Sequence, residues 1–302
     1  KQVASGFSNL LASNQVLGQQ RQNFVSVKDE TSGKVIIGVE DGANNSYCDL
    51  LFYVNASKTI EEPNDRPVIT PDDGNEPEKP DVTETKTGTL AFEDIWPGGG
   101  DYDMNDVIVE YNRAVSFDKK NQVTKIVDTF TPVHDGAVFA NAFAYQVDKG
   151  QFGKMTFSAT TEGIHTESAT SSIIVCPNVK QAIQKVYTIT REFTGGSFNK
   201  KDLKSYNPYI IVKYAEGQKG RTEVHLPKHE ATSLADLSLA GTQKDAYYID
   251  KEGAYPFAID IPILNFISVT EKKSIDTEYP NFKAWADSKG EKYTDWYNNH
   301  VN

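Results

Sequence analysis

The stretch "VIVEYNRAVSFDKKNQVTKIVDTFTPV" (107–133) decides the fold class of this chain. It contains two runs rich in Val, Ile, Thr and aromatic residues, separated by the polar segment "DKKNQ". Branched and aromatic side chains favour strands because they pack well on a pleated, half-buried surface. We therefore predict two β-strands here and an all-β domain around them.

Further runs of the same kind follow, bounded by Gly, Asn, Asp or Pro. They are "AVFANAFAYQV" (137–147), "SSIIVCP" (171–177), "KVYTIT" (185–190) and "YIIVKYA" (209–215). Short strands with turn residues between them are typical of a β-sandwich or jelly roll, whereas βαβ units would alternate strands with helical patterns. The predicted fold class is an all-β sandwich or jelly roll.

Helical character is strongest near the C-terminus, in "NFKAWADSKGEKYTDWYNN". Phe282 and Trp285 lie three residues apart, as do Tyr293 and Trp296, so each pair can share one side of a helical turn. A glycine between the two pairs is expected to separate them. We predict short C-terminal helices whose aromatic side chains cap the β core.

Composition excludes two classes of function. The formal net charge is −11 and the Lys and Arg residues are scattered, which argues against a nucleic-acid partner because phosphate binding needs clustered basic side chains. No apolar run reaches the roughly 18 residues that a transmembrane helix needs. The chain opens at "KQVASGFSNL" without an initiator Met, so we expect that a targeting segment, and with it a lipid anchor, was trimmed away.

One segment differs sharply from the rest of the chain. The stretch 61–86 holds five of the thirteen prolines and nine acidic residues against three basic ones. Proline removes backbone donors and like charges repel, so this stretch should be extended and solvated. We predict a small β segment over 1–60, an acidic Pro-rich linker or loop over 61–87, and a β-sandwich domain over 88–302.

The sequence "FEDIWPGGGDYDMND" (92–106) concentrates oxygen-bearing side chains around a glycine-rich turn. Alternate spacing lets successive side chains converge from a tight turn, and glycine permits the bent backbone. Carboxylate and amide oxygens are the ligands that Ca²⁺ prefers, in sets of six to eight. We therefore predict a structural Ca²⁺ site formed by Glu93, Asp94, Asp101, Asp103, Asn105 and Asp106.

Other interpretations of this acidic turn remain open. The Asp side chains could instead accept hydrogen bonds from backbone N–H groups in Asx-turns. That arrangement would leave several like charges close together, with Arg113 as the one basic residue nearby. A catalytic role is the third interpretation. Mg²⁺ is disfavoured because it keeps several waters, and Zn²⁺ because no Cys or His is near. The turn is not an EF-hand, since Asp106 stands where the motif has Gly and Asn112 where it has Glu.

A weaker copy of the turn precedes the linker. The stretch "KVIIGVEDGANNSYCDLLFYVNA" (34–56) also reads strand, Glu-Asp, Gly/Asn-rich turn, Asp, strand, and is four residues shorter between the strands. We interpret the two stretches as an internal duplication. The upstream copy has lost most of its charge, and whether it binds metal stays open; its candidate ligands are Asp41, Asn44, Ser46 and Asp49.

These residues also carry a family resemblance. The stretch "FEDIWPGGGDYDMNDVIVEY" (92–111) resembles the acidic signature that opens LruC-domain proteins of bacterial cell envelopes. The resemblance continues in "VHLPKHEATSLAD" (224–236) and in "YPFAIDIPILNFISVTEKKSIDTEYPNFKAWADSKGEKYTDWY" (255–297), and covers about 88–300. The upstream copy resembles the end of a related calcium-type β module. The resemblance implies a secreted or surface-anchored lipoprotein with a β-sandwich and no established catalytic activity.

Residues for catalysis are sparse. His225 and His229 lack a third metal ligand close by, and His134-Asp135 lacks an obvious Ser or Cys nucleophile. The two cysteines, Cys48 and Cys176, form no CxxC pair, and two buried thiols are favoured over a single bridge. We expect no enzymatic activity.

The function predicted from the sequence is a non-catalytic, calcium-stabilised binding or adhesion module at the bacterial cell surface. Its expected partner is an extracellular glycan or a host or matrix protein, because exposed aromatic side chains can stack on sugar rings. The main alternative is a structural spacer domain in an envelope assembly. A secreted polysaccharide-degrading enzyme is less favoured, and would need two carboxylates roughly 5–10 Å apart in a groove.

Overall fold

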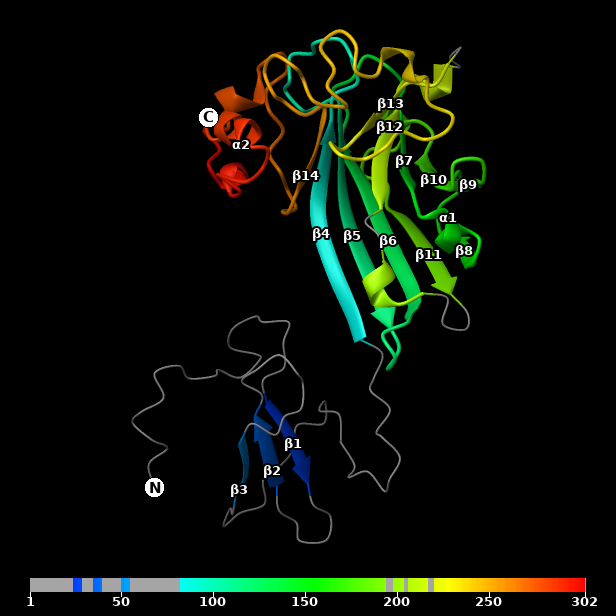
Figure 1. Cartoon of the computed structure of the whole chain (residues 1–302), viewed down its shortest axis with the longest axis vertical. Coiled ribbons are helices and arrows are strands. Elements are labelled where there is room, and N and C mark those ends of the chain that lie inside the picture. Colours follow the sequence, from blue (N-terminus) through cyan, green and yellow to red (C-terminus); the bar gives the residue numbers. More distant parts are fainter. Residues whose placement is uncertain are drawn as a thin grey trace. The chain divides into compact units, whose positions relative to one another are not determined.

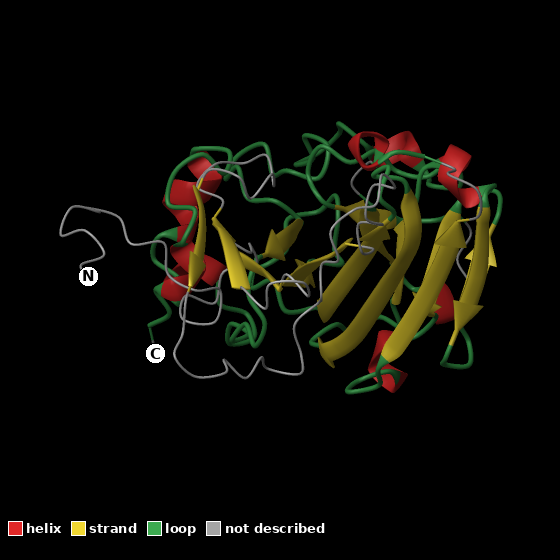
Figure 2. Cartoon of the chain, turned by 90° about the horizontal axis from the view of Figure 1, so that it is seen from below, coloured by secondary structure: helices red, strands yellow, loops and turns green. Residues whose placement is uncertain are grey.

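The computed structural model describes residues 24–28, 35–39, 50–54, 82–193, 198–203, 206–216 and 220–301. The chain divides into two compact units, residues 1–78 and residues 79–302, each described by itself (Figure 1). Strands form most of the regular structure, and the helices are short (Figure 2). The prediction of an all-β fold is confirmed.

The first unit contains a three-stranded antiparallel sheet. Its strands are β1 (Phe24–Lys28), β2 (Val35–Val39) and β3 (Leu50–Val54), in the order β1-β2-β3. The upstream turn that joins β2 to β3 lies outside the described residues, and so do its four candidate ligands and Cys48.

The hairpin β2–β3 matches the hairpin that follows the linker. Val39 pairs with Leu50 upstream, and Phe92 pairs with Val107 downstream. In both hairpins the first strand therefore ends directly before Glu-Asp, and the second begins directly after Asp. This equivalence of strand ends supports the interpretation of an internal duplication.

Two antiparallel sheets form the second unit. Among the described residues, one sheet has the order β14-β4-β5-β6-β11-β8 and the other β13-β12-β7-β10-β9. The first consists of β4 (Val82–Phe92), β5 (Val107–Phe117), β6 (Val123–His134), β8 (Met155–Ala159), β11 (Tyr187–Phe193) and β14 (Ala258–Ile261). The second consists of β7 (Ala142–Gln146), β9 (His165–Glu167), β10 (Ser172–Cys176), β12 (Asn207–Ile211) and β13 (Glu223–His225).

The helical elements are short and lie between or after the strands. They are α1 (Lys149–Phe152), α2 (Phe282–Asp287) and 3₁₀ turns at Val179–Gln181, Lys200–Asp202, Tyr214–Glu216, Leu237–Leu239, Ile275–Thr277 and Trp296–Asn298. No helix in the described part of the chain has the length and apolar character needed to cross a membrane.

The main core lies between the two sheets. Phe130 of β6 meets Phe143 and Tyr145 of β7, with ring centroids 5.1 and 5.3 Å apart. Ile173 of β10 and Ile189 of β11 are fully buried in the same cluster. Burying each large apolar side chain contributes about 1.5–3 kcal/mol, so facing sheets with alternating inward residues give a stable sandwich. The β-sandwich prediction is confirmed.

A second cluster covers the outer face of the six-stranded sheet. Ile108 of β5 points to this face, opposite to its neighbours in the main core. Phe282 of α2 and Trp296 of the last 3₁₀ turn pack over it, with ring centroids 4.8 Å apart. Gly290, between these two elements, has a left-handed backbone (φ 83°). The predicted short C-terminal helices are present and Phe282, Trp285 and Trp296 form the cap, whereas Tyr293 lies outside these helices and is half exposed.

One predicted boundary differs from the structure. Strand β4 begins at Val82, inside the stretch 61–87 that we interpreted as a linker or loop. Its first residues are exposed and charged, but Val82 pairs with Phe117 and the ladder continues without a break to Phe92. Backbone pairing with a long neighbour outweighs the polar composition. Residues 61–81 of the predicted linker lie outside the described part.

Cys176 is the cysteine whose surroundings are described. Its thiol is free and fully buried on β10. Burial raises its pKa to about 12, so it remains protonated and unreactive at neutral pH.

Candidate metal centre

The loop of residues 93–106 joins β4 to β5 at the end of the six-stranded sheet where several long connections gather (Figure 1). Tyr102 and Met104 have left-handed backbones, each with φ of 56°. Left-handed residues at alternate positions coil the chain tightly, so the side chains of Asp101 and Asp103, on either side of Tyr102, can lie close together. The local sequence thus bends the acidic residues into a compact loop.

Three carboxylates of this loop converge, and we call them the acidic cluster: Glu93, Asp101 and Asp103. One oxygen from each lies within 4.8 Å of the others. Ca²⁺ binds oxygen at 2.3–2.6 Å, so two oxygens on one ion lie at most about 5.2 Å apart. The spacing of the acidic cluster satisfies this limit.

Glu93 is the buried member of the acidic cluster, with 1% of its surface exposed. Its Oε1 accepts a hydrogen bond from the Met104 N–H at 2.6 Å, whereas its Oε2 has no partner among the described residues. A buried carboxylate oxygen without a partner is costly. A Cβ at Gly100 would lie 2.4 Å from this oxygen, so glycine there leaves room beside it.

Asp103 ties the loop to a distant part of the chain. Its Oδ1 accepts from the Asn105 N–H (3.2 Å) and its Oδ2 from the Lys272 N–H (2.9 Å). Asp101 is exposed at the mouth of the acidic cluster. The cluster therefore combines one buried, one anchored and one open carboxylate, all of them hard oxygen ligands.

The charges of the loop are unbalanced without a cation. Burial, and after it the charge of Asp106, raises the pKa of Glu93 well above its usual value. Burial likewise raises the pKa of Asp103. Burial and the neighbouring Asp94 raise the pKa of Asp106 to about 8. A divalent cation would supply the missing positive charge and return these groups to their ionised form.

Asp94 and Asp106 form a pair. Asp106 Oδ2 accepts from the Asp94 N–H at 2.7 Å. Asp94 Oδ2 accepts from Asn141 Nδ2 at 2.7 Å, and Asn141 Oδ1 accepts from the Lys213 N–H. This pair therefore joins the loop to the five-stranded sheet.

Asn105 faces in two directions. Its Nδ2 donates to the Val269 carbonyl at 3.1 Å, while its Oδ1 is buried without a partner among the described residues. A Cβ at Gly136 would lie 2.4 Å from this oxygen, so the β6–β7 connection passes close to it. Asn105 thus joins the acidic loop to the segment around Phe266 and Val269, which crosses the outer face of the six-stranded sheet.

Three of the six predicted ligands therefore form one close group. The structure brings Glu93, Asp101 and Asp103 together and links Asp106 to Asp94 through a backbone hydrogen bond, while the charge of Asp106 still acts on Glu93. Asn105 donates its backbone N–H to Asp103, and its side-chain oxygen is buried without a partner among the described residues. Sequence analysis missed the distant groups that fix the loop. They are the side chain of Asn141 and the backbone of Val269 and Lys272, and no local pattern marks them.

More than half of the chain matches a known protein family. A family model described as "Domain of unknown function (DUF4842)" matches residues 121–297. The chain belongs to this family. The DUF4842 region includes Asn141, Val269 and Lys272, whereas the acidic loop itself precedes it. The family region therefore supplies the framework onto which the loop is fastened.

The fold is also similar to a solved structure. The crystal structure of a "Putative lipoprotein" from Bacteroides ovatus aligns with a TM-score of 0.52 and 16% sequence identity, covering 92% of this chain and 91% of that chain. At this identity the likeness concerns the fold alone. No curated protein matches significantly.

The histidines of the DUF4842 region lie outside the acidic cluster. His225 is fully buried, and its ring nitrogens contact Glu223 Oε2 and Asn207 Oδ1, both at 2.8 Å. His229 contacts the Pro227 carbonyl. Both histidines thus contact groups within the domain, and the acidic cluster has oxygen ligands only.

Proposed function

We propose that this protein is a non-catalytic, calcium-stabilised binding module of the bacterial cell surface. The observation that carries the proposal is the buried, unpartnered Oε2 of Glu93 beside the carboxylates of Asp101 and Asp103. Without a cation such a buried carboxyl would be protonated, as its raised pKa indicates, and it can ionise at neutral pH only beside a compensating positive charge. A hard divalent cation provides it, and Ca²⁺ accepts irregular sets of oxygen ligands more readily than Mg²⁺.

The ion would act mainly by tying segments together. Asp103 and Asn105 hold the backbone at Lys272 and Val269, so a cation on the acidic cluster would fix both the loop and the segment that crosses the sheet. Extracellular Ca²⁺ near the millimolar range is sufficient for weak sites of this kind. Calcium would thereby rigidify the loop end of the sandwich.

Two similarities support a location at the cell envelope. The LruC-like motifs extend over about 88–300, which includes the DUF4842 region. The structural neighbour is described as a lipoprotein. We infer that the chain is displayed at the bacterial surface by a lipid anchor, with an extracellular glycan or a host or matrix protein as its partner.

A polysaccharide-degrading enzyme is less well supported. Asp94 and Asp106 form a close carboxylate pair with raised pKa values, as such an enzyme requires. However, Asp94 is 3% exposed and its Oδ2 accepts from Asn141. A polymer cannot reach a buried carboxylate that is already hydrogen-bonded.

A structural spacer is the second candidate, because one strand edge is open. Strand β14 covers β4 at Thr89–Phe92 only, and the outer edge of residues 82–88 has no pairing strand in the described chain. An open edge can receive a strand from another protein. Lys86 and Glu84 on this stretch are exposed charges of the kind that protect edges, which favours the binding module over the spacer.

Calorimetric titration of the metal-free full chain with CaCl₂ tests the proposal. We expect one Ca²⁺ per chain in the wild type and none in Glu93→Gln, which keeps the side-chain size but removes the buried charge. Glu291→Gln carries the same substitution at an exposed site outside the acidic cluster and should bind normally. Absence of stoichiometric binding in the wild type would refute the calcium site.

A further inference from the structure

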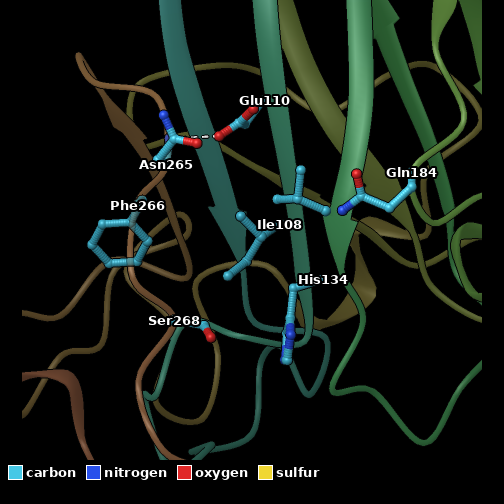
Figure 3. A pocket seen from close by; sticks show the side chains of 8 residues that line it. Ile108, Glu110, His134, Gln184, Asn265, Phe266 and Ser268 are labelled. Atoms are coloured by element: carbon cyan, nitrogen blue, oxygen red, sulfur yellow. Dashed lines mark hydrogen bonds between the residues drawn. The ribbon is translucent and has the colours of Figure 1, made fainter.

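An open cavity of about 350 Å³ lies beside the acidic loop, on the outer face of the six-stranded sheet (Figure 3). Its floor is formed by Ile108 of β5 and Val133 of β6. The segment of residues 265–268, which crosses the sheet, forms one wall. The cavity is therefore bounded by strands and by a crossing segment, and not by a single loop.

The rim of the cavity is polar. In Figure 3, Glu110, Gln184 and Asn265 lie in the upper part of the view and His134 and Ser268 in the lower part, with Ile108 between them. Glu110 Oε1 accepts from the Asn265 N–H at 2.5 Å. The other four polar side chains make no hydrogen bond to any residue in the described part of the chain; they are His134, Gln184, Asn265 and Ser268. Their donors and acceptors are thus available to a ligand.

The chemistry of this lining selects a class of ligand. Amide, imidazole and hydroxyl groups both donate and accept, as the hydroxyl groups of a sugar do. The lining contains one carboxylate and no Lys or Arg, so it does not favour an anion. A volume of about 350 Å³ is at the small end of ligand sites. We propose that this cavity binds one neutral saccharide unit.

The ring of Phe266 does not serve as a stacking surface. It points away from the cavity in Figure 3 and stacks on Tyr279, with centroids 5.1 Å apart. Recognition would therefore rest on hydrogen bonds from the rim over the apolar floor, a mode in which the pattern of hydroxyl groups decides which sugar binds.

The wall of the cavity is fastened to the acidic loop. Val269, directly after the wall, accepts from Asn105 Nδ2, and Lys272 donates its N–H to Asp103. At the other end, Asn265 is held by Glu110. Calcium on the acidic cluster would hence hold the wall in place. This saccharide site deepens the proposed function and rests on it for its location at the cell surface.

Methyl-labelled full-length protein in CaCl₂ tests the site by NMR. The probes are the methyl glycosides of glucose, galactose, mannose, fucose and N-acetylglucosamine, added one at a time. We expect at least one to shift the methyl signals of Ile108 and Val133 and the ring signals of His134 in a saturable manner. No shift with any of the five would overturn the proposal.

Two variants locate the binding. Gln184→Met keeps the side-chain length while removing the amide, and neither residue is favoured over the other at the left-handed backbone of this position (φ 63°), so the variant should weaken binding about tenfold without a new backbone strain. Gln181→Met makes the same change on the preceding turn, outside the cavity lining, and should bind as the wild type does. Equal affinity in Gln184→Met and the wild type would overturn the proposal.

Calcium titration of the same samples separates the two proposals. A chain that binds Ca²⁺ but no glycoside would leave the calcium site standing and overturn the saccharide site. A chain that binds a glycoside with no response to EDTA would support the cavity and contradict its calcium dependence.

Discussion

Replacing Asp101 by Asn should remove most of the calcium dependence of thermal stability without damaging the metal-free fold. Asp101 is exposed, and its carboxylate accepts no hydrogen bond from the described residues. Asp103 and Glu93 accept hydrogen bonds from backbone N–H groups, so their loss would disturb the loop in any condition. Asp101→Asn therefore isolates the contribution of the cation.

The magnitude follows from linkage. At a Ca²⁺ concentration a thousandfold above Kd, binding stabilises the wild type by about 4 kcal/mol. For a unit the size of residues 79–302, this raises Tm by about 8–16 °C. If the variant binds about a hundredfold more weakly, about 1.4 kcal/mol remains and the rise falls to about 3–6 °C.

In EDTA, Asp101→Asn should no longer melt below the wild type. The charge of Asp101 raises the pKa values of Glu93 and Asp103, which means that it repels them. Removing it should leave the metal-free variant at least as stable as the metal-free wild type. Glu291→Gln, an exposed charge removal elsewhere, is the control and should keep the full calcium response.

Differential scanning calorimetry measures the Tm of the wild type and of Asp101→Asn, each in EDTA and in excess CaCl₂. The reasoning fails if wild type and Asp101→Asn gain the same Tm from calcium. It also fails if the variant melts several degrees lower than the wild type in EDTA, because Asp101 would then support the fold by some contact other than a cation.

Two further predictions concern stability. Asp128 is buried between Arg113 and Arg191, at 2.6 and 2.9 Å, so Asp128→Asn should cost about 3–5 kcal/mol in urea unfolding, whereas Asp287→Asn at an exposed pair with Lys283 should cost under about 1 kcal/mol. Burial opposes the ionisation of Asp128, but the two guanidinium groups outweigh it and lower its pKa. The stabilisation by the ionised carboxylate is therefore present above the unfolded pKa of about 3.9 and is lost as pH falls through the lower folded pKa. In acid unfolding, the difference in unfolding free energy between wild type and Asp128→Asn should narrow only below about pH 4. Phe282→Ala should cost about 3–5 kcal/mol because the ring is fully buried against Trp285 and Trp296, while Tyr293→Ala, at a half-exposed ring, should cost far less; equal costs would contradict the aromatic cap.

The strands were predictable because their signal is local. The run beginning at Val107 and the run beginning at Val123 appear as β5 and β6, since branched and aromatic residues alternate along them and every second side chain reaches the core. The pair Phe282 and Trp285 likewise marked α2, and Trp296 marked the last 3₁₀ turn, but Tyr293 lies outside that turn. Strand β4 extended further upstream than expected because ladder pairing with β5 is a contact between segments, which composition does not record.

By itself the sequence determined an all-β chain with an acidic loop rich in hard oxygen ligands, because residue type and spacing fix strand preference and ligand chemistry. Only the tertiary structure decided which oxygens meet. It grouped Glu93 with Asp101 and Asp103, paired Asp106 with the Asp94 N–H, and joined Asn105 to Val269, 164 residues away. Such contacts depend on how the crossing segment passes over the sheet, and that path is set by the packing of the whole sandwich.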